Sequence, residues 1–232
     1  MSALELTVAT EDEATVAVAT QSRATVIARR VLDVSIAILV LVALLPVLAL
    51  VALAIRVESP GSVIFRQRRV GRGRGTFTLF KLRSMRSDAD PASHRAYVQN
   101  LIASGQDAPK DESGQLYKLG NDTRVTRVGA FIRRWSLDEL PQLLNVIRGE
   151  MSLVGPRPVI EYEVEAYPSW YHGRFAVKPG LTGLWQVSGR NERTYEEMVR
   201  LDLEYAERQT LFLDIKILAR TAVCVLKRQG AA

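Results

Sequence analysis

Residues 34–55 read "VSIAILVLVALLPVLALVALAI", a run of 22 residues without one charged side chain. A helix needs about 20 apolar residues to cross the hydrocarbon core of a bilayer, so this run is long enough. A buried helix of a soluble protein is the alternative, but such helices seldom stay uncharged over this length. The run therefore predicts a membrane helix.

Basic residues flank the run on both sides: Arg23, Arg29 and Arg30 before it, and Arg56, Arg66, Arg68 and Arg69 after it. Lysine and arginine mark the cytoplasmic side of a membrane segment, so a helix that enters the bilayer and returns satisfies this rule at both ends. Pro46 removes a backbone hydrogen bond within the run and offers a place to bend. A straight or mildly kinked span remains the alternative, because membrane helices tolerate proline.

The overall composition restricts the possible partners and metal sites. The 232 residues need no second domain, and a formal net charge of +6 favours an anionic partner such as nucleic acid, a membrane surface or a phosphorylated substrate. Cys224 is the single cysteine, which excludes an intramolecular disulfide. Apart from Cys224, only His94 and His172 are of the residue types that usually bind zinc. The chain therefore lacks the usual set of zinc ligands, so any metal must be held by oxygen.

Residues 60–86 hold eight Lys or Arg and no Asp or Glu. Within them, "SVIFRQ" at 62–67 and "TFTLFKL" at 76–82 alternate as strands do, and "GRGRG" at 71–75 supplies a turn. A glycine-rich loop can also cradle phosphate, but this one lacks the Walker lysine and a following helix. The pattern therefore favours a small β-hairpin.

Residues 135–142, "WSLDELPQ", place the carboxylates of Asp138 and Glu139 side by side. Ser136 with Glu139 three residues later fits a capping box, with Pro141 in the first turns of the helix. That interpretation leaves Asp138 unexplained. Adjacent carboxylates also suit a divalent cation that cancels their repulsion, and a carboxylate can act as a nucleophile. A structural cap and a catalytic site both remain open at this point.

The segment around this octet is expected to form a helix, a break and a second helix that ends near Gly149. Arg157 follows, between Pro156 and Pro158, whose rings restrict the backbone on both sides of it. An arginine held in this way is suited to bind a phosphate with its planar guanidinium.

Residues 211–228, "LFLDIKILARTAVCVLKR", intersperse Leu, Ile and Val with four basic residues: Lys216, Arg220, Lys227 and Arg228. This mixture predicts an amphipathic helix at a membrane interface. A core helix with one solvated face is the alternative.

Four motifs occur in the order and spacing of the bacterial sugar transferase family: "KLRSM" at 81–85, "RRWSLDELPQLLNVIRGEMSLVGPRP" at 133–158, "KPGLTGLWQVSGRN" at 178–191 and "LDIKIL" at 213–218. Over roughly residues 25–230 the chain resembles the monotopic phosphoglycosyl transferases of that family. The resemblance implies transfer of a sugar-1-phosphate from a UDP-sugar to polyprenyl (undecaprenyl) phosphate, with release of UMP and with Mg²⁺ as cofactor. Such a reaction is the first membrane step in the synthesis of a polysaccharide or glycoconjugate, for example exopolysaccharide or lipopolysaccharide.

The resemblance also implies roles for individual residues. Asp138 corresponds to the nucleophile that forms a phosphosugar-aspartyl intermediate, and Glu139 to its acidic partner at the metal. Lys81, in the "KLRSM" motif, corresponds to a lysine near the active site. Arg133 and Arg157 correspond to arginines that meet phosphate groups.

Further positions are matched outside the central motif. Gln186 and Arg190 correspond to nucleotide-side recognition, and Asp214 to an acid of the last helices that we add to the expected metal ligands. Pro46 corresponds to the proline that turns the membrane helix back. Leu45 departs from the serine that often precedes that proline, and without its hydroxyl the bend is expected to be less firmly held.

The expected fold class is α/β: a mostly helical, membrane-associated single domain with a re-entrant membrane helix and a small β-hairpin. We expect a disordered tail at 1–24, a re-entrant helix-break-helix at 25–58, and a catalytic domain at 59–232 with interfacial C-terminal helices. The protein is expected to be monotopic, on the cytoplasmic face of a bacterial inner membrane.

The expected partners are the UDP-sugar, polyprenyl phosphate and membrane lipids, without nucleic acid. A homodimer through residues 87–120 is a further possibility. The rival interpretation is a membrane-tethered nucleic-acid-binding or scaffold protein, but adjacent acids in a basic neighbourhood weaken phosphate binding unless a metal intervenes. A transferase that moves the sugar alone and releases UDP is the other enzyme considered. The sequence does not identify the sugar.

Overall fold

The computed structural model describes residues 21–86, 124–189 and 193–227, together with Arg95, Val98, Gln99 and Ile102. Nearly all of the predicted tail and most of the proposed dimer segment lie outside the described residues. Arg190 also lies outside them.

The described residues are mostly helical and form two small two-stranded sheets. The elements are α1 (Arg23–Glu58), β1 (Ile64–Val70), η1 (Arg72–Arg74), β2 (Thr76–Leu82), α3 (Arg127–Arg134), η2 (Leu137–Glu139), α4 (Gln142–Arg148), β3 (Ser152–Val154), α5 (Glu161–Val164), η3 (Ser169–Ala176), β4 (Gly180–Thr182), η4 (Trp185–Val187), α6 (Tyr195–Arg208) and α7 (Leu211–Leu226), where η denotes a 3-10 helix. The predicted mostly helical fold with a hairpin is confirmed, whereas the sequence did not predict the second sheet.

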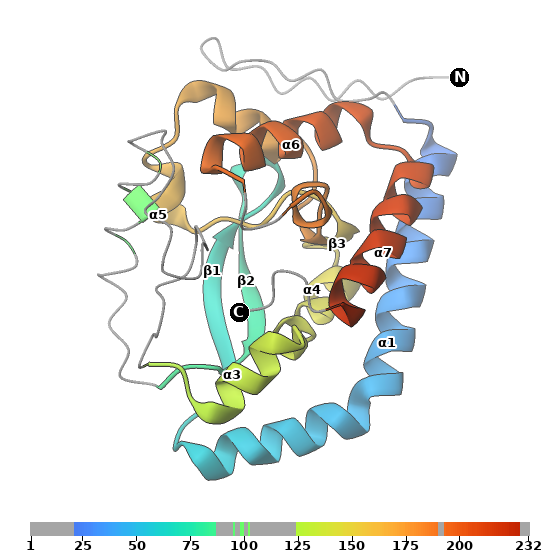
Figure 1. Cartoon of the computed structure of the whole chain (residues 1–232). Coiled ribbons are helices and arrows are strands. Elements are labelled where there is room, and N and C mark those ends of the chain that lie inside the picture. The colour runs from blue at the N-terminus through green and yellow to red at the C-terminus, as the bar shows by residue number, and fades with distance from the viewer. Residues whose placement is uncertain are drawn as a thin grey trace.

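Helix α1 contains the apolar run and is long and apolar enough to cross a membrane. Only 11% of the most apolar 18-residue stretch of this helix is buried, which contradicts the alternative of a core helix in a soluble protein. The helix is continuous through Pro46, so the expected break is absent from the helix itself. Figure 1 instead shows a pronounced change of direction, with the last turns of α1 running across the base of the molecule. A proline inside a helix is the usual cause of such a kink.

The first turns of α1 are joined to the rest of the protein by polar contacts. Arg30 donates hydrogen bonds to the carbonyl oxygens of Val146 and Ile147, at 2.5 and 2.7 Å. These two carbonyls belong to the last turn of α4, whose C-terminal end carries a partial negative charge that favours a cation. Helix α1 is thereby fixed to the element that follows the acid pair.

Asp33, one turn further along α1, is buried against β3. Its carboxylate accepts hydrogen bonds from Ser152 Oγ at 2.6 Å and from the Leu153 amide at 3.0 Å. A buried carboxylate must be compensated in this way, because removing it from water is costly. Asp33 therefore belongs to the interior of the domain although it lies on the candidate membrane helix.

Strands β1 and β2 form the predicted antiparallel hairpin, in a register that pairs Ile64 with Leu82 and Val70 with Thr76. The predicted "GRGRG" turn is confirmed as η1, where Gly73 has a φ of 63° that glycine adopts without steric cost. The register brings Lys81 to the end of the hairpin opposite the turn, next to the basic residues that follow β2.

Strands β3 and β4 pair in parallel and connect two of the quoted motifs. Gly155 and Gly180 lie where the backbones meet: a Cβ atom on Gly180 would lie 2.1 Å from the Gly155 nitrogen. Only glycine permits this approach. The contact places the "GPRP" end of one motif against the start of "GLTG" in the next.

Candidate active site

The acid pair lies on the one-turn helix η2 between α3 and α4. Ser136 precedes it with a φ of 54°, in the left-handed region, and makes no side-chain hydrogen bond that caps the turn. The Glu139 side chain is bonded to strand β2 instead. The predicted capping box of Ser136 and Glu139 is therefore wrong, because the α-helix begins only at Gln142, after Pro141. The predicted end of that helix at Gly149 is confirmed.

Two cations lie beside the acid pair. Lys81, near the end of β2, donates a hydrogen bond to Glu139 Oε1 at 2.9 Å. Arg133, in the last turn of α3, is held through its Nε by Ser84 Oγ at 2.8 Å. Both cations favour the ionised form of Asp138 and so act to lower its pKa. The structure thus gathers Lys81, Arg133, Asp138 and Glu139 into one cluster from three elements, while the chemical roles expected of them remain predictions.

Asp138 is half-buried, and this governs its ionisation. Its pKa is raised to about 6, first by burial and then by the adjacent charge of Glu139, while Lys81 and Arg133 act in the opposite direction. The Asp138 carboxylate is therefore mostly ionised at pH 7 and becomes protonated as the pH falls below about 6. Only the ionised form can attack phosphorus as a nucleophile.

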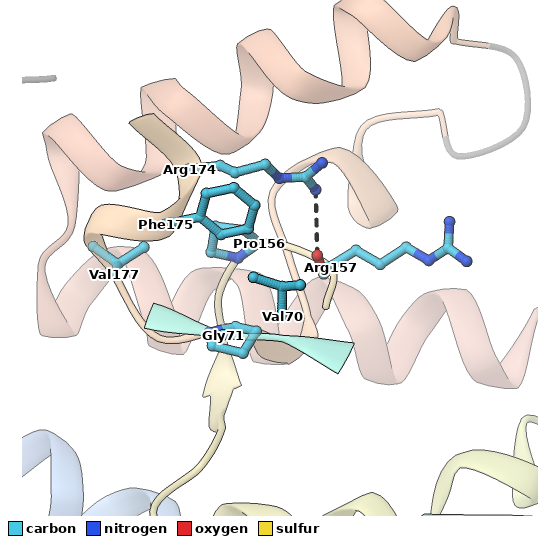
Figure 2. Close-up of a pocket in the computed structure, with 8 residues that line it drawn as sticks. Val70, Gly71, Pro156, Arg157, Arg174, Phe175 and Val177 are labelled. Atoms are coloured by element: carbon cyan, nitrogen blue, oxygen red, sulfur yellow. Dashed lines mark hydrogen bonds between the residues drawn. The ribbon is translucent and has the colours of Figure 1, made fainter. Parts of the chain in front are cut away.

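Arg157 lies in a three-residue segment whose backbone carbonyls are all used. Pro156 O accepts from the Gly180 amide at 2.8 Å, and Arg157 O accepts from Arg174 Nη2 at 3.3 Å. Pro158 O accepts from Arg69 Nη1 at 2.9 Å. Figure 2 shows the crevice behind this segment, with the Arg157 side chain directed away from its apolar lining. The backbone around Arg157 is therefore restrained by hydrogen bonds as well as by the two prolines.

The Arg157 guanidinium lies in an acidic environment. Burial lowers its pKa, but the charges of Glu163 and Glu139 and the nearby Tyr195 outweigh burial, so that the pKa is raised. Arg69 has a pKa lowered to about 10, mainly by burial and by the positive charge of Arg157, with Glu163 opposing. The two guanidinium groups share the buried Glu163 carboxylate, whose negative charge acts to raise the pKa of each. The influence of Glu139 on both arginines links this basic wall to the acid pair.

A buried polar network supports the backbone of Arg157, and it was not predicted from the sequence. Glu163 lies 3.8 Å from Arg69 and accepts a hydrogen bond from the Tyr195 hydroxyl at 3.0 Å. Arg174 forms an ion pair with Asp202, and both side chains are only 1% exposed. The available signal was a charged residue among mostly apolar ones, as in "GRFAV" around Arg174, and this does not identify a partner 28 residues away.

Asp214 does not join the acid pair. It forms an ion pair with Arg29 Nε at 2.6 Å and accepts a hydrogen bond from the Tyr205 hydroxyl at 2.7 Å. Within the described ranges, no three His, Cys, Asp or Glu side chains are grouped so that they could hold a metal ion. Gln186 lies on η4, which packs against α6 and α7. Its expected role in nucleotide recognition remains a prediction, and the same holds for Arg190.

The donor set at η2 nevertheless fits magnesium. Mg²⁺ is commonly held by one or two carboxylates and completes its coordination with water and substrate phosphates. Asp138 and Glu139 supply two carboxylates beside a wall of cations that would bind a diphosphate. The fit therefore requires substrate oxygen atoms as well as protein ligands, and it does not require Asp214.

Comparison of the sequence with known proteins identifies the class to which the chain belongs. The model of the bacterial sugar transferase family matches residues 24–228, so the chain belongs to this family, as the motifs predicted. Among its relatives is the exopolysaccharide production protein ExoY of Sinorhizobium fredii, 43% identical over 205 residues that cover 88% of each chain.

Two further relatives have names that describe a reaction. The UDP-galactose-lipid carrier transferase of Erwinia amylovora is 45% identical, over 88% of this chain and 41% of the relative. The UDP-glucose:undecaprenyl-phosphate glucose-1-phosphate transferase of Caulobacter vibrioides is 40% identical, over 88% of this chain and 71% of the relative. The chain thus spans most of some relatives and about two fifths of others.

Proposed function

We propose that this chain transfers a sugar-1-phosphate from a UDP-sugar to polyprenyl phosphate and releases UMP. The class of reaction, a polyprenyl-phosphate glycosyl-1-phosphate transfer, follows from family membership and from the names of relatives that act on undecaprenyl phosphate. The observation that carries the mechanism is the half-buried Asp138 carboxylate, which is influenced by the charges of Lys81 and Arg133 and lies beside a second acid. The product would be the first lipid-linked intermediate of a polysaccharide or glycoconjugate.

The proposed mechanism has two displacements at phosphorus. An Asp138 oxygen attacks the phosphorus attached to the sugar, the P–O bond to the nucleotide breaks, and its electron pair leaves with UMP. A phosphosugar-aspartyl intermediate remains. An oxygen of polyprenyl phosphate then attacks the same phosphorus and displaces the Asp138 carboxylate, which is thereby regenerated. Splitting the transfer in this way lets two very different substrates use one nucleophile in turn.

The cations around Asp138 would neutralise the charge that moves during each displacement. Arg157 and Arg133 are proposed to bind the phosphates of the donor, and Lys81 to orient Glu139 as well as to attract the donor. Mg²⁺ held by Asp138 and Glu139 would supply further charge neutralisation at the diphosphate. Preorganised positive groups of this kind are usually the largest contribution to catalysis of phosphoryl transfer.

The position of the site relative to the membrane supports a lipid acceptor. Helix α1 is apolar and mostly exposed, yet its first turns are bonded to α4, which directly follows η2. With basic residues on both flanks of the apolar run, we propose that the bend in α1 makes it re-entrant. Both ends would then lie on the cytoplasmic face of the bacterial inner membrane, where the headgroup of polyprenyl phosphate meets the site.

The test is the mass of the intact protein after incubation with UDP-sugars and Mg²⁺ in the absence of the lipid acceptor. The wild-type chain should gain the mass of one sugar phosphate, with one equivalent of UMP released. Asp138→Ala and Asp138→Asn should gain none, because neither side chain is an effective nucleophile at phosphorus. An adduct that persists in Asp138→Ala would place the nucleophile elsewhere, and release of UDP would show that the sugar moves without its phosphate.

A further inference from the structure

A groove of about 240 Å³ lies between α6, α7 and Leu184, the residue before η4, and none of its lining residues belongs to the acid cluster. Leu184, Leu213 and Ile217 form its apolar part. Ile217 is buried in the cluster that also holds Ala37 of α1, so the floor of the groove is part of the core. The groove is therefore formed by packed helices and not by a loose surface loop.

The charged residues of the groove leave an excess of positive charge. Glu204 and Arg208 satisfy each other through an ion pair of 2.8 Å. Lys216 and Arg220 are exposed on α7 and form no ion pair with any part of the chain that the structure describes. The groove thus presents two uncompensated cations above an apolar floor.

Helix α7 arranges its side chains in parallel lines along its length. One line is apolar and exposed: Phe212, Ile215, Val223 and Leu226. The next line is basic: Lys216, Arg220 and Lys227. Because a helix advances 100° per residue, the basic line falls between the exposed apolar line and the residues that face the groove. Basic side chains at such a boundary are typical of helices that lie at the headgroup level of a bilayer.

The groove is on the part of the molecule that adjoins the candidate membrane helix. Asp214 of α7 binds Arg29 of α1, and Figure 1 shows α7 beside the first half of α1. The exposed apolar side chains of the two helices, such as Phe212 at 78% and Leu39 at 68%, are available to lipid. A ligand of the groove would therefore meet the bilayer surface.

We propose that this groove binds one anionic phospholipid, with its phosphate between Lys216 and Arg220. The glycerol and the start of the acyl chains would lie on the apolar floor of the groove, formed by Leu184, Leu213 and Ile217. A soluble anion would use the two cations but leave the apolar floor exposed to water. An amphiphile satisfies both parts of the groove, which is the reason for assigning it to lipid.

The test uses the full chain in a neutral detergent, so that its melting temperature can be measured with added lipid. Dioleoyl phosphatidylglycerol should raise the melting temperature in a saturable manner, whereas dioleoyl phosphatidylcholine should not. The variant Lys216→Gln/Arg220→Gln should bind phosphatidylglycerol about 30-fold more weakly, as expected for two basic residues that contact an anionic headgroup. The surface variant Arg95→Gln/Arg200→Gln loses the same charge away from the groove and should bind normally.

Three outcomes would overturn the proposal. Equal effects of phosphatidylglycerol and phosphatidylcholine would show that the cations do not select the lipid. Equal stabilisation by glycerol 3-phosphate or inorganic phosphate would identify a site for soluble anions. Finally, Ala219→Lys/Ala222→Lys can be added to the Lys216→Gln/Arg220→Gln variant to restore the charge on another line of α7. Restored affinity in that variant would show that any basic surface on the helix is sufficient.

Discussion

The two walls of the candidate active site are built in opposite ways. On the arginine side, the backbone of residues 156–158 is held by three hydrogen bonds and supported by the buried Arg174–Asp202 pair. On the acid side, Asp138 and Glu139 lie on a single turn of 3-10 helix, half-exposed, with Ser136 in a left-handed conformation before them. One wall is fixed from within the core, and the other is a short loop that carries reactive groups.

This difference fits what each wall is proposed to do. Phosphate oxygens must be met by donors that are already in place, because preorganisation is what makes such donors effective. A nucleophile that forms and breaks a bond changes its charge in every cycle, and its neighbours must adapt to each state. The following variants test whether the fixed wall and the adaptable wall differ in the way proposed.

The largest effect is expected from Asp202→Asn. This change leaves the Arg174 guanidinium buried without its counter-charge, which costs about 3–5 kcal/mol of unfolding free energy. Urea unfolding in detergent measures the loss. The control is Glu196→Gln, which breaks the exposed pair with Arg200 and should change stability by less than about 0.5 kcal/mol. Equal effects of the two variants would show that the buried network does not support the arginine wall.

Arg157→Lys should come next. Lysine keeps the charge but loses the planar fork, so UMP release should fall about 100-fold or more while the protein stays folded and membrane-bound. Unchanged melting temperature together with the activity loss would assign the effect to phosphate binding. Turnover within a few-fold of wild type would remove Arg157 from the site.

Glu139→Gln should lower turnover about 10- to 100-fold through weaker metal placement, while the covalent adduct on Asp138 still forms.

The Glu139→Gln change should also move the pH profile. Wild-type kcat/KM should fall as the pH drops through about 6, because Asp138 becomes protonated. Glu139 raises the pKa of Asp138, so its neutralisation should move this fall to lower pH. A fully active variant with an unshifted profile would reduce Glu139 to a structural residue.

Ser136→Gly should have the smallest effect. Glycine adopts a φ of 54° without the steric cost that serine bears, so stability should rise by less than about 1 kcal/mol, and activity should stay within about twofold. Ser188→Gly is the matched control, because Ser188 has a φ of −117° and gains nothing from glycine. Destabilisation by Ser136→Gly would mean that the serine hydroxyl contributes more to the acid wall than its φ suggests.

Local patterns predicted much of the fold. Period-two alternation located both strands of the hairpin, Gly149 marked the end of α4, and an uncharged run identified α1. The capping-box prediction failed because a Ser-x-x-Glu pattern does not reveal the left-handed backbone at Ser136. The buried network escaped notice for a different reason: Arg69, Glu163 and Arg174 belong to separate elements, and one sequence contains no information on which charged residues meet after folding.

The contacts of Arg30 and Asp33 have a consequence for protein engineering. A truncation that begins at residue 59 to obtain a soluble enzyme would remove the donor to the Val146 and Ile147 carbonyls and the acceptor of Ser152. The same truncation would leave Asp214 without Arg29. The trimmed protein would therefore expose unsatisfied polar groups in what had been its interior. The shortest foldable version of the enzyme must therefore include the start of α1, and because the exposed apolar run of that helix is retained with it, it will need detergent.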